Sequence, residues 1–276
     1  LSNYYVMRAL MEAGLPAGKR GGQALRIETA SAGRGRDRSY PSVMPSPAAI
    51  DPPGAFTDPL ARALFEPRAI ALIGASADPA KNTARPQLFL RKHGYTGALY
   101  PVNPGRAEVL GETAYPTAAE IPGPVDHALI MVPAPRVVPA LEDCARKGIP
   151  VVTIYSDGFT EAGPEGAAMQ QALVARAQAL GVRLLGPNSI GMINVAGQVP
   201  LSVNAALACE ALTPGRVAFV SQSGTMLGTA LAVLAARGEK PVASATFLTS
   251  LLDFTDTGIL DVFIDDAFVE YREKEM

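Results

Sequence analysis

The residues from Gly215 to Thr225 have the pattern of an anion-binding turn. The apolar run 217–220 is followed by the small polar sequence SQSGT, and a long apolar helix pattern comes next. The turn is therefore expected at the N-terminus of a helix, where backbone N–H groups and the positive end of the helix dipole favour an anion. The residues that would hold it are Ser221, Ser223, Gly224 and Thr225.

A second candidate site follows the apolar run AIALI at 69–73, in the sequence LIGASADPAKN. Gly74 allows a sharp turn and a close approach of ligand, and ligands of parallel sheets bind beyond the carboxyl ends of the strands. The dinucleotide fingerprint G-x-G-x-x-G has three glycines, but Gly74 alone is present here. The pattern favours a phosphate-bearing nucleotide other than NAD, and a turn without a ligand stays an alternative.

The next apolar run ends in YPVNPGR, which contains Asn103, Pro104 and Arg106. Dinucleotide folds usually carry Asp or Glu at this point to bind the ribose hydroxyls. The sequence has no carboxylate there, whereas an arginine suits a phosphate. This again argues against NAD, although Arg106 could also be a solvated surface residue.

Alternating strand and helix patterns must position these turns. Apolar strands without alternation are typical of a parallel sheet covered on both faces, and right-handed crossovers then give a doubly wound, Rossmann-like α/β fold. Strands are expected at 69–73, 98–102, 127–132, 150–155 and 182–186, and helices at 85–94, 135–148 and 163–181.

The chain divides into three parts by composition. Residues 1–56 are rich in Gly, Pro, Ser and Arg and are expected to be a disordered or linker segment, with a transit peptide as an alternative. Residues 57–196 would form the Rossmann-like domain. Residues 197–276 would contain a connector and an incomplete second α/β unit, with a strand at 216–220, a helix at 223–237 and a strand at 242–248. The first residue is Leu1, so a fragment is expected.

Composition excludes several classes of function. The net charge of −2 gives no basic field for nucleic acid, and no run of eighteen apolar residues could span a membrane. Cys144 and Cys209 lie far apart without metal-ligand spacing. We expect both to be core thiols of a reducing, cytoplasmic compartment, and we expect no metal site.

Six motifs resemble those of the NDP-forming acyl-CoA synthetases in order and spacing: IALIGAS, YPVNPGRAEVLG, IMVPAP, YSDGFTE, LGPNSIG and GRVAFVSQSGT. That family includes the ADP-forming acetate–CoA ligases and, more distantly, the succinyl-CoA ligase alpha subunit. The resemblance covers residues 58–238. It implies a CoA-binding domain at 57–196, followed at 197–276 by the start of a flavodoxin-like ligase domain similar to that of succinyl-CoA synthetase.

The resemblance also implies a role for each motif, with SDGFTE facing the CoA cleft. The implied CoA-binding residues are Gly74, Ala75 and Ser76 at the phosphates, Asn103, Pro104 and Arg106 at the adenosine end, Val132, Pro133, Ala134 and Pro135 along pantetheine, and Asn188 near the thiol. The turn at 221–225 would hold the phosphate of a phosphohistidine. Structural alternatives stay open for Pro133 and Pro135 as a strand end and helix start, for Asn188 as a turn residue, and for Ser223 as an N-cap.

The family reaction is acid + CoA + ATP ⇌ acyl-CoA + ADP + phosphate, with a histidine carrying the phosphate. The chain has two histidines, His93 and His127, and both precede the SQSGT turn. Neither matches the phosphohistidine, so both are expected to be structural and no catalytic residue is expected in this chain. A serine hydrolase also needs a histidine after its serine, which excludes a nucleophile elbow at SQSG.

The resemblance implies coenzyme A as the ligand, with ATP or ADP and Mg bound only by a missing domain or a separate ATP-grasp subunit, and an oligomer. Residues 251–276 depart from the family pattern, which favours a truncated chain over a frameshift or a natural subunit. A non-catalytic CoA-binding regulatory module remains an alternative, and an NAD-binding Rossmann protein is the less favoured one. The acyl substrate is not indicated.

Overall fold

A computed structural model of the protein describes residues 58–212 together with Gly224 and Gly228. Its centre is a parallel sheet of five strands in the order β2-β1-β5-β6-β7. This is the doubly wound α/β order, so the predicted fold class is confirmed. The strands are β1 (Ala69–Ile73), β2 (Ala98–Val102), β5 (His127–Ile130), β6 (Val151–Ile154) and β7 (Arg183–Leu185).

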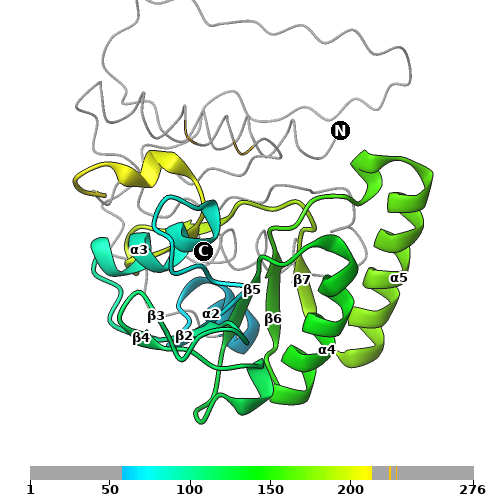
Figure 1. Cartoon of the computed structure of the whole chain (residues 1–276), viewed down its shortest axis with the longest axis horizontal. Helices are drawn as coiled ribbons and strands as arrows, with labels where there is room; N and C mark the ends of the chain where they lie inside the picture. Colours follow the sequence, from blue (N-terminus) through cyan, green and yellow to red (C-terminus); the bar gives the residue numbers. More distant parts are fainter. Residues whose placement is uncertain (1–57, 213–223, 225–227, 229–276) are drawn as a thin grey trace, which may run out of the picture. The chain divides into compact units, whose positions relative to one another are not determined.

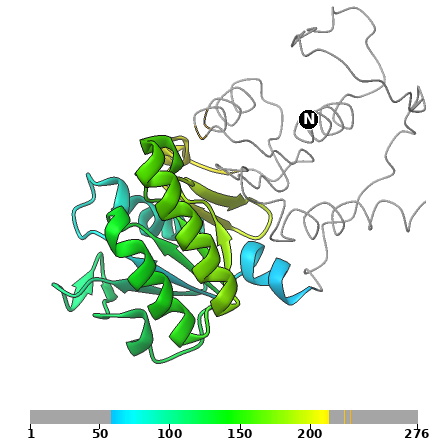
Figure 2. The ribbon, with the colours of Figure 1, turned by 90° about the vertical axis from the view of Figure 1, so that its right-hand side faces the viewer.

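Helices cover both faces of this sheet. Figures 1 and 2 show α4 and α5 together on one side and α2 and α3 on the other. The helices are α2 (Pro59–Phe65), α3 (Arg85–Lys92), α4 (Val137–Lys147) and α5 (Pro164–Leu180). Short 3-10 turns lie at η1 (Asn82–Ala84), η2 (Ala118–Glu120), η3 (Ala134–Arg136), η4 (Thr160–Ala162) and η5 (Ala205–Ala208).

Local sequence determines where these helices begin and end. The Asp58 carboxylate caps α2, because its Oδ1 accepts the N–H groups of Leu60 and Ala61 at 2.8 Å each. α4 and α5 end at Gly148 and Gly181, whose φ angles of 79° and 69° lie in the left-handed region that glycine adopts at helix C-termini. The predicted ends of both helices, at residues 148 and 181, are therefore confirmed.

Successive residues of each central strand point to opposite faces, so the sheet has a core on each side. On the face of α4 and α5, Ala71 and Ile73 pack with Leu141, Cys144 and other buried residues. The opposite core contains the alternate strand residues and side chains from α2 and α3. It includes Ile70, Leu72, Leu129, Met131, Phe65 and Leu90.

The prediction of a connector after residue 196 is wrong in part. β8 (Gly191–Asn194) and β9 (Val199–Ser202) pair antiparallel as a hairpin. All their residues are buried, and β9 packs against α3. Full burial removes the alternation of apolar and polar residues that marks a half-buried hairpin strand. Two further strands, β3 (Glu108–Val109) and β4 (Glu112–Thr113), form a separate short hairpin.

The two cysteines differ in environment. Cys144 is buried in α4, as predicted, and burial raises the pKa of its thiol to about 12. Cys209 is exposed, so the prediction that it is a core thiol is wrong. It directly follows η5, in which Leu207 is buried.

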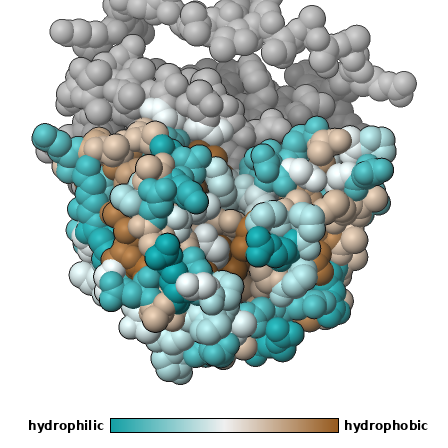
Figure 3. Space-filling model, in the orientation of Figure 1, coloured by the Kyte–Doolittle hydropathy of each residue, from teal (hydrophilic) through white to brown (hydrophobic). Residues whose placement is uncertain are grey.

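The visible face of the described part is mostly hydrophilic, with apolar residues in narrow areas between polar ones (Figure 3). Within the described ranges, no helix is long and apolar enough to cross a membrane. The disordered or linker segment predicted at 1–56 and the strands and helix predicted at 216–248 lie outside the described residues, apart from Gly224 and Gly228. The three-part domain division therefore stays a prediction.

Candidate functional site

The strand order reverses between β1 and β5, and we refer to the region at the carboxyl ends of these two strands as the crevice. From β1 the chain crosses to β2 on one side and then returns to β5 on the other. Ligands of open α/β sheets bind at this kind of switch point, because the connecting loops diverge there. Gly74 directly follows β1, and Val132 lies two residues beyond the end of β5.

Gly74 is held in a conformation that a side chain would not fit. Its φ is 86°, and its N–H donates to the Val102 carbonyl at 2.9 Å. A Cβ at this position would lie 2.9 Å from Cγ1 of Val132 and 3.0 Å from the carbonyl oxygen of Met131. The backbone of the first turn therefore packs directly on the loop after β5, and the predicted close approach of a ligand stays a prediction.

Asn103 ties the loop after β2 to the same turn. Its Nδ2 donates to the Ala75 carbonyl at 2.9 Å, and its Oδ1 accepts the Gly105 N–H at 2.9 Å. Both ends of the amide are thus engaged within the protein. Ser76 is half-buried in the turn, and its Oγ accepts the Asp78 N–H at 3.1 Å. The two polar side chains thus hold the backbone of these loops in place.

Arg106 and Pro104 are exposed in the loop after β2. The structure gives the Arg106 guanidinium no side-chain partner among the residues it describes, while its backbone N–H donates to the Asn103 carbonyl at 3.3 Å. An exposed guanidinium in this loop is suited to a phosphate group.

The loop after β5 contains the predicted sequence VPAP. Val132 and Ala134 are half-buried, whereas Pro133 and Pro135 are exposed. β5 ends at Ile130 and η3 begins at Ala134, so the structural interpretation of the prolines, a strand end and a helix start, fits the geometry.

The sequence SDGFTE was expected to face the cleft, but two of its side chains bond to nearby backbone. Ser156 is buried, and its Oγ donates to the Val132 carbonyl. The Glu161 carboxylate accepts the N–H groups of Gly158 at 2.8 Å and Phe159 at 3.3 Å. Burial alone would raise the pKa of Glu161. The hydrogen bonds from backbone N–H groups stabilise the carboxylate more strongly, so its pKa lies below the usual value. Both residues therefore shape the loop.

Asn188 lies in the loop after β7, next to the cis peptide bond between Gly186 and Pro187. It is exposed and has a φ of 54°, a conformation that asparagine tolerates better than most residues. Its N–H donates to the Ser156 carbonyl at 2.9 Å. The loops after β6 and β7 are thus joined at the carboxyl edge of the sheet.

Of the predicted anion-binding turn, Ser221, Ser223 and Thr225 lie outside the described residues. Gly224 is helical, and its carbonyl accepts from Nδ2 of Asn204 at 3.1 Å. A Cβ on Gly224 would lie 2.7 Å from Cδ1 of Ile190. Gly224 therefore packs against the loop that also contains Asn188.

Sequence reasoning missed two polar residues at the crevice, Asn82 and Tyr155. Nδ2 of Asn82, in η1, donates to the Tyr155 hydroxyl at 3.4 Å. Tyr155 was assigned to the end of a strand at 150–155, but β6 ends at Ile154, so Tyr155 begins the loop. A phenol ring directly after a buried apolar run was the available signal.

Both histidines lie in structural positions. His93 ends α3, and its Nε2 bonds to the Leu207 carbonyl at 2.7 Å. His127 is fully buried in β5, with Nε2 at 2.7 Å from the Thr153 hydroxyl. Burial lowers the pKa of His127 to about 4, so it is neutral at pH 7. Neither histidine lies in a loop at the crevice.

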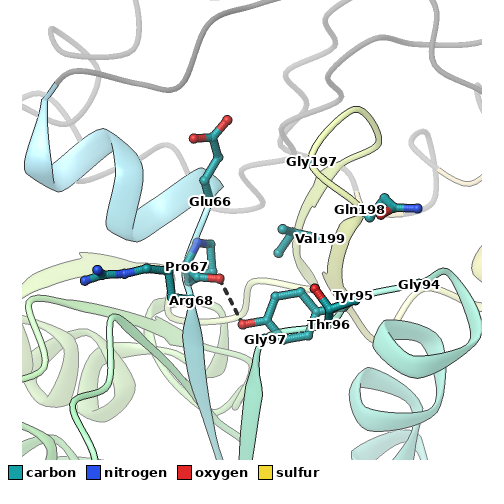
Figure 4. Close-up of a pocket in the computed structure, with 10 residues that line it drawn as sticks. All are labelled: Glu66, Pro67, Arg68, Gly94, Tyr95, Thr96, Gly97, Gly197, Gln198 and Val199. Carbon is teal, nitrogen blue, oxygen red and sulfur yellow. Dashed lines mark hydrogen bonds between the residues drawn. The ribbon is translucent and has the colours of Figure 1, made fainter.

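A pocket of about 300 Å³ opens at the opposite edge of the sheet, before β1 and β2 (Figure 4). The Tyr95 hydroxyl donates to the Pro67 carbonyl at 2.9 Å beside it. This pocket lies at the amino ends of the strands, away from the switch point. It is lined by Glu66, Pro67, Arg68, Gly94, Tyr95, Thr96, Gly97, Gly197, Gln198 and Val199.

Residues 68–195 match the family described as "CoA binding domain". The alpha subunit of acetate–CoA ligase [ADP-forming] I from Pyrococcus furiosus is 39% identical over 208 residues, which are 74% of this chain and 44% of the relative. The apo structure of the dinucleotide-forming acetyl-coenzyme A synthetase 1 of Ca. Korarchaeum cryptofilum is 31% identical with a TM-score of 0.66, over 73% of this chain and 43% of that chain.

A third similarity is of a different kind. Fifty residues, 18% of this chain, are 70% identical to the poly(3-hydroxyalkanoate) polymerase subunit PhaC of Cupriavidus necator, where they make up 8% of the protein. So short a share of PhaC carries no functional argument.

The chain spans less than half the length of the two ligase relatives. The residues matched by the family model, 68–195, include the loops after β1, β2, β5, β6 and β7. Residues 68–195 belong to the CoA-binding domain family, and the chain as a whole is similar to ADP-forming acetate–CoA ligases.

Proposed function

We propose that this chain binds coenzyme A and supplies the CoA-binding portion of an NDP-forming acyl-CoA synthetase. One observation carries the proposal: a glycine turn without room for a side chain follows β1 at the β1/β5 switch point, and Arg106 is exposed in the loop after the neighbouring strand β2. A turn of that kind lets phosphate groups approach the backbone, and the arginine supplies the opposite charge.

The residues around the crevice would divide the ligand among them. Gly74 and Ser76 would contact the diphosphate, and Arg106 would pair with a phosphate at the adenosine end. Val132 would contact the pantetheine arm. Asn188 would lie toward the thiol, since its loop follows β7, which is separated from β5 only by β6.

The parent reaction would be acid + CoA + ATP ⇌ acyl-CoA + ADP + phosphate. We propose that the chain alone does not catalyse it, because neither of its histidines lies in a loop at the crevice. The phosphate-carrying histidine, and an ATP-grasp component that would bind ATP with Mg, would both come from another chain or segment. The name of the Pyrococcus furiosus relative, an alpha subunit, supports such a division.

The test is calorimetric titration of the full chain with CoA, with dephospho-CoA and NAD as comparison ligands. We expect CoA to bind and NAD not to bind. Arg106→Ala should weaken CoA roughly 3- to 10-fold, as expected for loss of a partly solvated charge-assisted hydrogen bond, and should leave dephospho-CoA nearly unchanged. Preference for NAD, or no binding of CoA, would refute the proposal.

A separate assay addresses catalysis. The full chain is incubated with acetate, ATP, Mg and CoA, and acetyl-CoA is measured with and without an added ATP-grasp subunit from an ADP-forming acetate–CoA ligase. Product formed by the chain alone contradicts the proposed inactivity. Binding of CoA without product in either mixture is the expected result, because neither the chain nor the ATP-grasp subunit would supply the phosphate-carrying histidine.

A further inference from the structure

We propose that Asn82 and Tyr155 together bind a secondary amide of the pantetheine arm of CoA. This proposal rests on the proposed function and deepens it. It assigns recognition of the arm to two side chains that the family resemblance did not name as CoA-binding residues. The pair would let the chain distinguish CoA from nucleotides that share only its adenosine phosphate half.

The strand order places the pair across the crevice. Tyr155 directly follows β6, and its N–H donates to the Ile130 carbonyl at 2.9 Å, at the end of β5. Its hydroxyl meets Asn82, which belongs to η1 in the connection after β1. Because β5 lies between β1 and β6, the contact spans the carboxyl end of β5. A ligand arm leading from the Gly74 turn toward Asn188 must pass this contact.

The hydrogen-bonding groups of the pair match an amide. In the contact with Asn82, the Tyr155 oxygen accepts, so its own O–H remains able to donate. Neither that O–H nor Oδ1 of Asn82 bonds to another group in the part of the chain that the structure describes. An amide carbonyl would accept from the Tyr155 hydroxyl, and the amide N–H would donate to Oδ1 of Asn82.

Packing supports Tyr155 as the fixed member of the pair. Its ring is half-buried and packs against the core on the α2 and α3 side, whereas Asn82 is exposed. The distance of 3.4 Å between the two side chains lies beyond the usual range for a strong N–H···O bond. Little interaction energy is therefore lost if Asn82 turns toward a ligand.

Pantetheine contains two secondary amides, whereas adenosine 3′,5′-bisphosphate contains none. The experiment titrates both ligands into the full chain and into its Tyr155→Phe and Asn82→Ala variants. Each variant should raise the Kd for CoA roughly 3- to 10-fold, the range expected for one lost neutral hydrogen bond. The Kd for the bisphosphate should stay unchanged. Tyr95→Phe is the matched control, because it removes a hydroxyl at the opposite edge of the sheet.

The outcomes separate the two proposals. Loss of CoA affinity with unchanged bisphosphate affinity, in both variants but not in the control, supports amide recognition. Equal weakening of both ligands, or no weakening of CoA, overturns it while leaving CoA binding in place. Failure of the unmodified chain to bind CoA refutes the proposed function and the amide assignment with it.

Discussion

Replacing Gly74 by alanine tests whether the crevice depends on direct packing between the turn after β1 and the loop after β5. Gly148 provides the matched control, because the φ angles are 86° and 79°. A Cβ on Gly148 would meet nothing within 4 Å, whereas one on Gly74 would lie 2.9 Å from Val132 and 3.0 Å from the Met131 carbonyl. The two variants thus share the backbone cost and differ in steric contact.

The expected magnitudes follow from these environments. An alanine in the left-handed region costs about 1–2 kcal/mol, which is the whole effect expected for Gly148→Ala. Forcing an additional methyl group into a packed site costs about 1–3 kcal/mol more. The free energy of unfolding should therefore decrease by about 2–5 kcal/mol in Gly74→Ala. Movement of Val132 should also weaken CoA binding in that variant.

The assay is urea unfolding of the full chain followed by far-UV circular dichroism, with CoA titration at 25 °C. Gly148→Ala should keep the CoA affinity of the unmodified chain. Equal losses of stability in the two variants would refute the reasoning, since they would show that the contact with Val132 and Met131 relaxes without cost.

Three further predictions concern stability and reactivity. His127 has a pKa of about 4 instead of 6.5, because burial disfavours its charged form and the nearby Asp126 offsets this only in part. The unfolded chain takes up this proton at a higher pH than the folded chain does. The free energy of unfolding should therefore decrease by up to about 3 kcal/mol as pH falls from 6.5 to 4. In urea titrations, His127→Gln should make the free energy of unfolding less dependent on pH over this range. A thiol reagent should modify Cys209 in the folded chain and Cys144 only after unfolding, which mass spectrometry can follow. Asp58→Ala should lower the unfolding free energy by about 1 kcal/mol through loss of the α2 cap, whereas Asp58→Asn should retain most of it.

The central sheet was predictable because its strands are short apolar runs between helix patterns. β1 and β2 have the predicted bounds, and the other three are one or two residues shorter at one or both ends. Because both faces of the sheet are buried, each strand is an almost unbroken apolar run, which is typical of a parallel sheet. The positions of the candidate site turns could be predicted for the same reason, because these turns directly follow the strands.

The hairpin of β8 and β9 was not predictable from local pattern, because polar residues and a proline interrupt its apolar signal. Asn194 is buried, and its Nδ2 donates to the Phe65 carbonyl at 3.1 Å. Ser202 is buried, and its Oγ donates to the Ile190 carbonyl at 2.6 Å. Hydrogen bonds to other segments of the chain satisfy these polar groups. Burial of the hairpin therefore depends on tertiary contacts that the local sequence does not reveal. The same holds for Asn103, whose amide reaches the Ala75 carbonyl.

The hairpin also explains how two separate motifs meet. The Asn204 N–H donates to Oγ of Ser202 at 3.1 Å, and Nδ2 of Asn204 donates to the Gly224 carbonyl at 3.1 Å. With the bond from Ser202 to Ile190, these contacts form one chain from the GPNSIG loop to the glycine of SQSGT. Each buried polar group in such a network depends on its neighbours, so displacement of one motif is opposed by the other. The loop proposed to face the thiol and the turn proposed to hold a phosphate are thus joined through residues that neither motif contains.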